Sequence, residues 1–103
     1  NTTSQEGTNA INQIRSRANA TPKAAYSLDD ICDEWSREFY FEGLRRPTLV
    51  RFNKYGGNVN YNWSWKGGVL AGRNIDAHFN IFAIPTTDMT ANQNLVQNPG
   101  YAN

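Results

Sequence analysis

Three glutamates recur at four-residue steps, Glu34, Glu38 and Glu42, and pairs of carboxylates are the groups that hydrolyse glycosidic bonds. A glycosidase pair must flank the scissile bond from opposite sides, whereas acids on successive turns of one helix point the same way. We therefore expect a packing network instead of an active site, and no catalytic residue is predicted. The expected partners are the arginines further along the same segment, Arg45, Arg46 and Arg51.

His78, with Asp76 and Asp88 nearby, is the one arrangement in the sequence that suggests a metal site. A single histidine without a cysteine or a second histidine at ligand spacing is more typical of a surface or hydrogen-bonding residue. The acids near it also lack the alternating spacing of a calcium loop. The sequence therefore predicts neither a metal ion nor a cofactor.

Four aromatic residues lie in a loop rich in glycine and asparagine, Tyr55, Tyr61, Trp63 and Trp65. Aromatic faces stack on the apolar face of a pyranose, and asparagine amides hydrogen-bond sugar hydroxyls, so these four are the local candidates for glycan contact. The competing interpretation is that the rings form the loop's own anchoring core. The loop contains few other apolar residues, which favours that second interpretation.

Composition limits what this chain does alone. Its hydrophobic fraction of 39% and mean hydropathy of −0.68 fall below the apolar content of about 45 to 50% that is usual for a self-sufficient domain. The formal net charge of +1 provides no field for gathering phosphates, so nucleic acid is not an expected partner. The single cysteine, Cys32, lies inside a helical pattern and cannot form an internal disulfide. A thin core predicts that the chain is a piece of a larger protein.

Helical patterns fill the first half of the sequence. Apolar residues at helical spacing predict one helix near residues 8–18 and a longer one near 27–46, opened by Ser27 as its N-cap and stopped or kinked by Pro47. A helical turn is expected at 48–53. The stripe that includes Trp35 and Phe39 is too large for the chain to cover by itself, so each helix needs a packing partner.

The second half lacks helical periodicity. Glycine, asparagine and proline recur through residues 54–103, which we expect to be irregular. Alternating apolar residues at 59–65 leave open either a short strand or an extended loop. Long irregular segments are uncommon in compact domains unless they line a functional surface or cover a scaffold.

Three separate blocks of the sequence stand in a recognisable order. The first is INQIRSRA at 11–18, and the second, the most specific, is EWSREFYFEGLRRPTLVRF at 34–52. The third joins FAIPTTD at 82–88 to NQNLVQNPGY at 92–101. Together these blocks resemble the carboxyl-terminal segment of the SusD-like (RagB/SusD) outer-membrane nutrient-binding lipoproteins, and the third is similar to the closing signature of that family. The WSWKGG at 63–68 is similar to the subgroup close to the starch-binding member.

The resemblance implies a mainly α fold, in which residues 1–103 are the carboxyl-terminal segment of a larger SusD-like domain. They would be the end of a tetratricopeptide-like helical scaffold followed by long irregular loops. It also implies a protein on the exterior face of the outer membrane, lipid-anchored through a residue upstream of this segment. The implied partners are an oligosaccharide or polysaccharide, a TonB-dependent outer-membrane transporter, and the remainder of the same polypeptide.

Two other functions remain open. A stand-alone aromatic-loop carbohydrate-binding module would fold and bind sugar as 103 residues. A lobe of a glycoside hydrolase would release reducing sugar from polysaccharide in the full-length protein. Neither alternative explains the uncovered apolar stripe on the helices.

Overall fold

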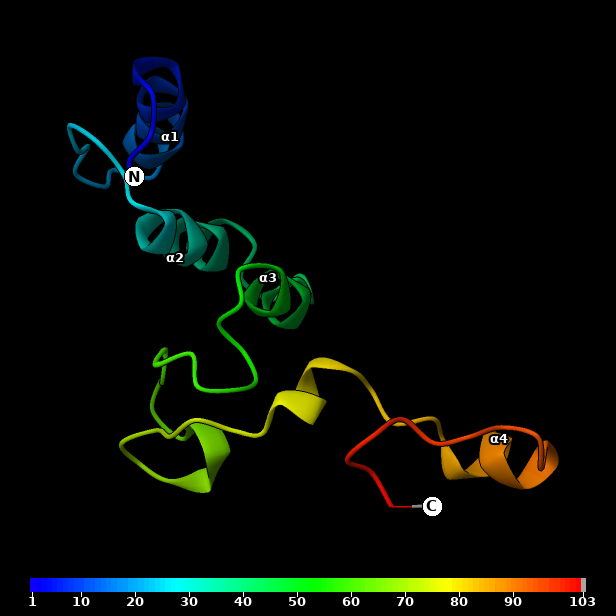
Figure 1. The fold of residues 1–103 in the computed structure, drawn as a ribbon. Helices are drawn as coiled ribbons and strands as arrows, with labels where there is room; N and C mark the ends of the chain where they lie inside the picture. The colour runs from blue at the N-terminus through cyan, green and yellow to red at the C-terminus, as the bar shows by residue number, and fades with distance from the viewer. Residues whose placement is uncertain (103) are drawn as a thin grey trace. The chain divides into compact units, whose positions relative to one another are not determined.

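Residues 1–102 are described in the computed structural model, and their regular secondary structure is helical (Figure 1). The elements in chain order are α1 (Gln5–Arg17), α2 (Leu28–Glu38), α3 (Arg45–Arg51), the 3₁₀ helices η1 (Lys66–Gly68) and η2 (Ala77–Asn80), and α4 (Thr86–Ala91). Strand pairing within the described residues is limited to isolated bridges at Thr2–Ser27 and Gly56–Ile75. The mainly α class is confirmed.

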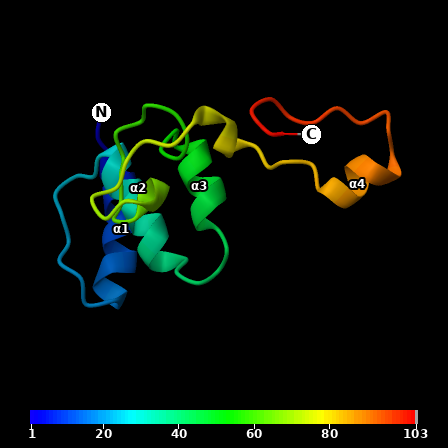
Figure 2. The same cartoon turned by 90° about the horizontal axis from the view of Figure 1, so that it is seen from below.

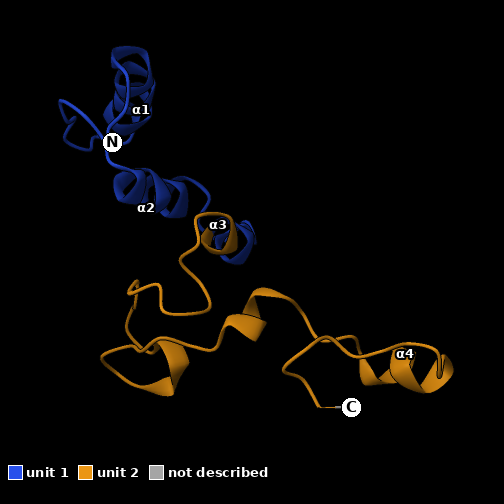
Figure 3. Ribbon diagram, viewed as in Figure 1, with its two compact units in different colours: residues 1–48 blue, residues 49–103 orange. Residues whose placement is uncertain are grey.

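The chain divides into two units, Asn1–Thr48 and Leu49–Asn103 (Figure 3). Unit 1 contains α1 and α2, and the boundary falls inside α3. A single helix pair does not by itself establish a tetratricopeptide-like array, so that part of the expectation stays a prediction.

Helix α1 begins earlier than residue 8 because Ser4 caps it. The Ser4 hydroxyl accepts a hydrogen bond from the Gly7 amide at 3.2 Å, which satisfies one of the donors that an N-terminus leaves free. At the other end, Asn19 takes a left-handed conformation with φ 59°, which asparagine tolerates and which ends the helix.

Helix α2 opens as expected and ends early. Ser27 and Asp30 form a reciprocal capping box, in which the Ser27 hydroxyl accepts from the Asp30 amide and the Asp30 carboxylate accepts from the Ser27 amide. The helix stops at Glu38, because Phe41 and Gly43 take positive φ values of 67° and 73°. The expected helix over 27–46 is therefore divided by a turn.

Pro47 does not stop a helix but lies near the start of one. It is the third residue of α3, where a missing amide hydrogen removes no internal hydrogen bond. The expected turn at 48–53 is thus the second half of a helix that starts at Arg45. Sequence reasoning assigned Pro47 to the end of a helix, and this was wrong. A proline after a helical pattern marks a helix end, but proline is also favoured in the first turn of a new helix, and the sequence alone does not distinguish the two.

Unit 1 is held together by few fully buried side chains and many polar contacts. Tyr26 is 1% exposed and Cys32 is fully buried. The Tyr26 hydroxyl bonds the Asn12 amide oxygen, while Asn12 also bonds both backbone groups of Lys23. Figure 2 shows α1 and α2 close together, and ion pairs from Arg15 and Arg17 of α1 reach the acids of α2.

Unit 2 consists mainly of loops, with short helices among them, and its segments are joined by hydrogen bonds within the unit. Its C-terminal stretch returns beside residues 81–84, as the red end of the ribbon in Figure 1 shows. The Gln97 amide bonds both backbone groups of Ile84, and the Tyr101 hydroxyl donates to the Ile81 carbonyl at 2.6 Å. The prediction of an irregular chain over 54–103 missed α4, whose threonines are poor helix formers. Asn103 lies outside the described residues.

Candidate functional site

Three of the four predicted aromatic residues form one cluster in unit 2. The Tyr55 and Trp63 ring centroids lie 6.2 Å apart with planes 21° from parallel, so the two rings are offset and nearly parallel. Tyr61 meets Trp63 edge-on at 6.5 Å. Both geometries are favourable for aromatic pairs. Because 40% of the Trp63 side chain is exposed, the cluster presents ring surface to its surroundings.

Trp65 stands apart from this cluster. Among residues 1–102, no ring contact joins it to the other three, and it is 65% exposed. Its φ of 71° lies in the left-handed region, which is costly for a bulky residue. The turn fixes that conformation through hydrogen bonds from the Trp65 amide to Val69 and Leu70 and from the Gly68 amide to the Trp65 carbonyl.

Two lysine ammonium groups lie against the cluster, and sequence reasoning did not single them out. Lys54 Nζ is 4.4 Å from the Tyr61 ring centroid, and Lys66 Nζ is 4.8 Å from that of Trp63. Both side chains are buried, with 9% and 2% exposed. The available signal was WK at 65–66, a lysine next to tryptophans in a segment without acids.

The asparagines of the loop bind one another and the backbone. Asn60 and Asn74 exchange two hydrogen bonds, from the Asn60 amide to Asn74 Oδ1 and from Asn74 Nδ2 to Asn60 Oδ1. Asn80 Oδ1 accepts from the Gly56 amide at 2.8 Å. These three amides therefore close the loop, while the exposed Asn62 beside Trp63 remains accessible to a ligand.

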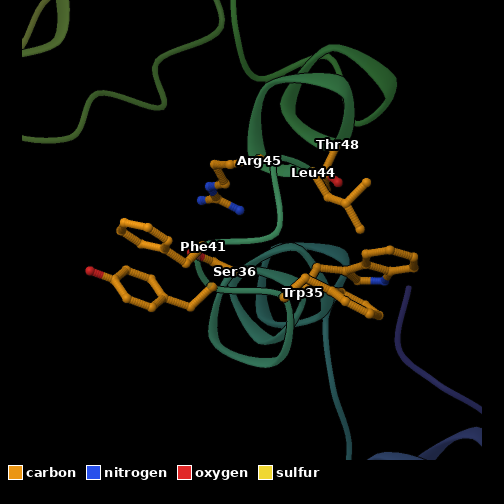
Figure 4. A pocket seen from close by; sticks show the side chains of 9 residues that line it. Trp35, Ser36, Phe41, Leu44, Arg45 and Thr48 are labelled. Atoms are coloured by element: carbon orange, nitrogen blue, oxygen red, sulfur yellow. The ribbon is translucent and has the colours of Figure 1, made fainter.

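Unit 1 contains a separate pocket of about 330 Å³ between α2 and the start of α3 (Figure 4). Figure 4 shows Trp35 on one side, Phe41 on the other, and Arg45 between them. Phe41 is 94% exposed, and Arg45 donates to the Cys32 carbonyl at 2.9 Å. A second hollow of about 300 Å³ lies along α1 and α2, where its apolar lining includes Ile14 and Phe39. Both hollows are formed by large apolar side chains that the described chain leaves uncovered.

Two of the three glutamates that suggested hydrolysis, Glu34 and Glu38, are paired with arginines. Glu34 binds Arg15 at 2.7 Å and Arg37 at 2.9 Å, and Glu38 binds Arg17 at 2.8 Å. The carboxylates therefore join α2 to α1, a set of partners different from the expected arginines beyond residue 44. The packing interpretation is the one that this geometry supports.

His78 and Asp76 form a local pair. The Asp76 carboxylate accepts from the His78 amide and lies 2.6 Å from the His78 ring, and these hydrogen bonds lower the pKa of Asp76. Within residues 1–102, no group of three or more metal-ligating side chains is found. In the same part of the chain, none of the helices combines the length and the apolar character that crossing a bilayer needs.

Comparison with known proteins identifies the family. Residues 1–101 match the SusD family. The chain is 43% identical over 97 residues to the starch-binding protein SusD of Bacteroides thetaiotaomicron, an alignment that covers 93% of this chain and 17% of that protein. The chain thus spans about a sixth of the length of this curated relative. A match over nearly every residue, together with the level of identity, shows that the chain belongs to the SusD family.

Proposed function

We propose that this chain is the carboxyl-terminal segment of a protein that binds starch-type oligosaccharides without hydrolysing them. The observation that carries the proposal is the 43% identity, over 93% of the chain, to a protein named for starch binding. The pairing of Glu34 and Glu38 with arginines supports the non-enzymatic part, because ion-paired acids on one helix face are poorly placed to act as an acid and a nucleophile.

Unit 1 serves as scaffold in this proposal. Its helices leave Trp35, Phe41 and Leu44 at 38%, 94% and 38% exposure beside the pocket. Exposed apolar surface of this kind marks an interface. The relative extends well beyond the matched segment, so the proposed cover is the remainder of the same polypeptide.

The aromatic loop of unit 2 would contribute ring contacts to the glycan. Trp63 presents part of its ring from within the cluster, and Trp65 presents most of its ring from the adjacent turn. Tyr55 and Tyr61 support Trp63 from two directions. A pyranose stacked on either indole would gain the contact that aromatic side chains give to flat apolar faces.

The proposed setting follows from the family. The full-length protein would lie on the exterior of the outer membrane, attached through a lipid on an upstream residue, and would deliver its glycan to a TonB-dependent transporter. Cys32 is unsuited to carry the lipid because it is fully buried within α2.

The test is calorimetric titration of the full-length protein with maltoheptaose, alongside Trp63→Ala, Trp65→Ala and, as a matched control, Phe82→Ala. Phe82 is an aromatic residue of unit 2 that is 71% exposed and lies outside the cluster. Loss of one stacking contact is worth about 0.5–1.5 kcal/mol, so each tryptophan variant should bind about two- to tenfold more weakly than wild type. The Phe82→Ala control should bind maltoheptaose with the affinity of wild type.

Each contrary outcome has a distinct meaning. Full-length protein that binds neither maltoheptaose nor amylopectin would overturn the proposed function. If the maltoheptaose affinities of Trp63→Ala and Trp65→Ala equal that of Phe82→Ala, both indoles serve packing and do not contact the glycan. Reducing sugar released from amylopectin would favour the glycoside hydrolase, and binding by the 103-residue chain alone would favour the stand-alone module.

A further inference from the structure

We propose that Lys66 is the positioning residue of the aromatic cluster: its ammonium group fixes Tyr55, Tyr61 and Trp63 in one arrangement. The inference rests on the proposed function only for its consequence for glycan binding. The arrangement itself follows from the contacts of one side chain.

Lys66 is 2% exposed, which is rare for a lysine. Among residues 1–102 no carboxylate pairs with it. Burial lowers the pKa of its ammonium group from the ordinary 10.5. A methionine would fill similar space without that desolvation cost, so the amine is suited to a role that needs hydrogen-bond donors.

The donors reach the peptide groups that carry the rings. Lys66 Nζ donates to the Tyr61 carbonyl at 2.8 Å and, at a longer 3.4 Å, to the Lys54 carbonyl. The Lys54 carbonyl belongs to the peptide bond that leads into Tyr55. The same ammonium lies 4.8 Å from the Trp63 ring centroid, within the range of a cation–π contact. One cation therefore contacts the Tyr61 backbone, the Trp63 ring and the carbonyl of the residue that precedes Tyr55.

The segment around Lys66 holds the amine in place. The Lys66 amide donates to the Trp63 carbonyl at 3.0 Å, and the Lys66 carbonyl accepts from the Arg73 amide at 3.1 Å. Arg73 also donates from Nε to the Gly67 carbonyl at 2.9 Å. Hydrogen bonds therefore hold the backbone of Lys66 on both sides, and the buried ammonium group keeps one position beside the rings.

The first arm of the test measures the lysine–indole contact without any glycan. Tryptophan fluorescence is recorded for full-length wild type, Lys66→Met, Trp63→Phe and the double variant. The Lys66→Met substitution should change the spectrum in the wild-type background and leave that of Trp63→Phe unchanged, since among the tryptophans of residues 1–102 it is Trp63 whose ring lies against the ammonium. Equal spectral changes in both backgrounds, or none in either, would overturn the inference.

The second arm measures maltoheptaose affinity. Lys66→Met should weaken binding about as much as Trp63→Ala, two- to tenfold, and the double variant should lose less than the product of the two single losses. Losses that multiply would show that Lys66 acts elsewhere and would overturn the positioning role. Lys66→Arg, which keeps a cation with N–H donors, should bind more tightly than Lys66→Met, and equal binding by the two would count against the proposal.

The two proposals fail in different ways. If wild type binds no glycan, the proposed function is lost, and the fluorescence arm alone decides the role of Lys66. If Lys66→Met does not fold, as judged by circular dichroism, Lys66→Arg takes its place in the fluorescence arm. If the fluorescence spectrum of Lys66→Arg is close to that of wild type, the positioning role of Lys66 is supported. If its emission shifts as expected for an indole moved out of the cluster, that role is refuted.

Discussion

Glu34→Gln tests whether a single carboxylate fastens α1 to α2. Glu34 Oε2 accepts from Arg15 at 2.7 Å and from Arg37 at 2.9 Å, while Arg15 also donates from Nε to the Thr21 carbonyl. Arg15 is thereby bound both to the loop after its own helix and to α2. Glutamine keeps the size of the side chain and one oxygen acceptor but removes the charge that both guanidinium groups share.

The expected magnitude comes from burial. The Arg15–Glu34 pair has 13% of each side chain exposed, and a hydrogen bond to a charged group of this kind contributes about 1.5–3 kcal/mol. Arg37 is 58% exposed, so its share is about 0.2–0.5 kcal/mol. We expect Glu34→Gln to lower the free energy of opening α1 from α2 by about 2 kcal/mol, or about 30-fold in the opening equilibrium.

Amide hydrogen exchange of the full-length protein measures this opening locally. Exchange in Gln5–Arg17 should accelerate about 30-fold in Glu34→Gln. Glu38→Gln is the matched control, because Glu38 also pairs with an arginine of α1 but at 31% and 68% exposure, where the effect should stay below about 1 kcal/mol. Equal acceleration in the two variants would refute the argument from burial, as would unchanged exchange in Glu34→Gln.

Two further predictions concern charge and backbone. The hydrogen bond from Lys23, followed by those from Ser27, lowers the pKa of Asp30 to about 2. The ionised Asp30 carboxylate therefore stabilises the fold fully above the ordinary pKa of 3.8, and this stabilisation is lost as pH falls toward 2. Exchange in α2 should therefore be faster in Asp30→Asn than in wild type at neutral pH, and a difference that does not shrink below about pH 4 would contradict this. Gly68 and Gly72 both have positive φ, but of the two only Gly72 lies where an added Cβ would clash with a carbonyl, that of Trp63. Gly72→Ala should therefore alter tryptophan fluorescence more than Gly68→Ala, which brings the backbone strain without the clash. Equal changes in the two spectra would show that the loop relaxes around the clash.

The sequence predicted the helices where local chemistry determines them. The N-cap at Ser27 and the apolar spacing that follows were enough to place the start of α2. The end of α2 was not predictable in the same way, because Phe41 takes a left-handed conformation that its residue type disfavours. Helix α4 was missed for a related reason, since a six-residue helix with three threonines has no apolar period to detect.

The residue types of the aromatic cluster were predictable from the sequence, but the contacts that each residue makes were not. Aromatic residues in a glycine-rich loop indicated a cluster, and Tyr55, Tyr61 and Trp63 form one. That Trp65 would be excluded depends on a turn that no periodicity reveals. Lys66 was missed because lysine is assigned to the surface by default, and its burial depends on carbonyls from residues five and twelve positions away.

Trp65 and Trp63 differ in how their conformations are held and in how much ring surface each exposes. A left-handed φ costs a bulky residue about 1–2 kcal/mol and persists only where the surroundings fix it. The hydrogen bonds of the turn supply that constraint, and they hold the Trp65 ring outward at 65% exposure. Trp63 is instead anchored on two tyrosines and a buried ammonium group, with 40% exposed. If the loop binds a glycan, Trp65 should therefore gain more contact area on binding, whereas Trp63 is the better pre-organised ring and should lose less conformational freedom.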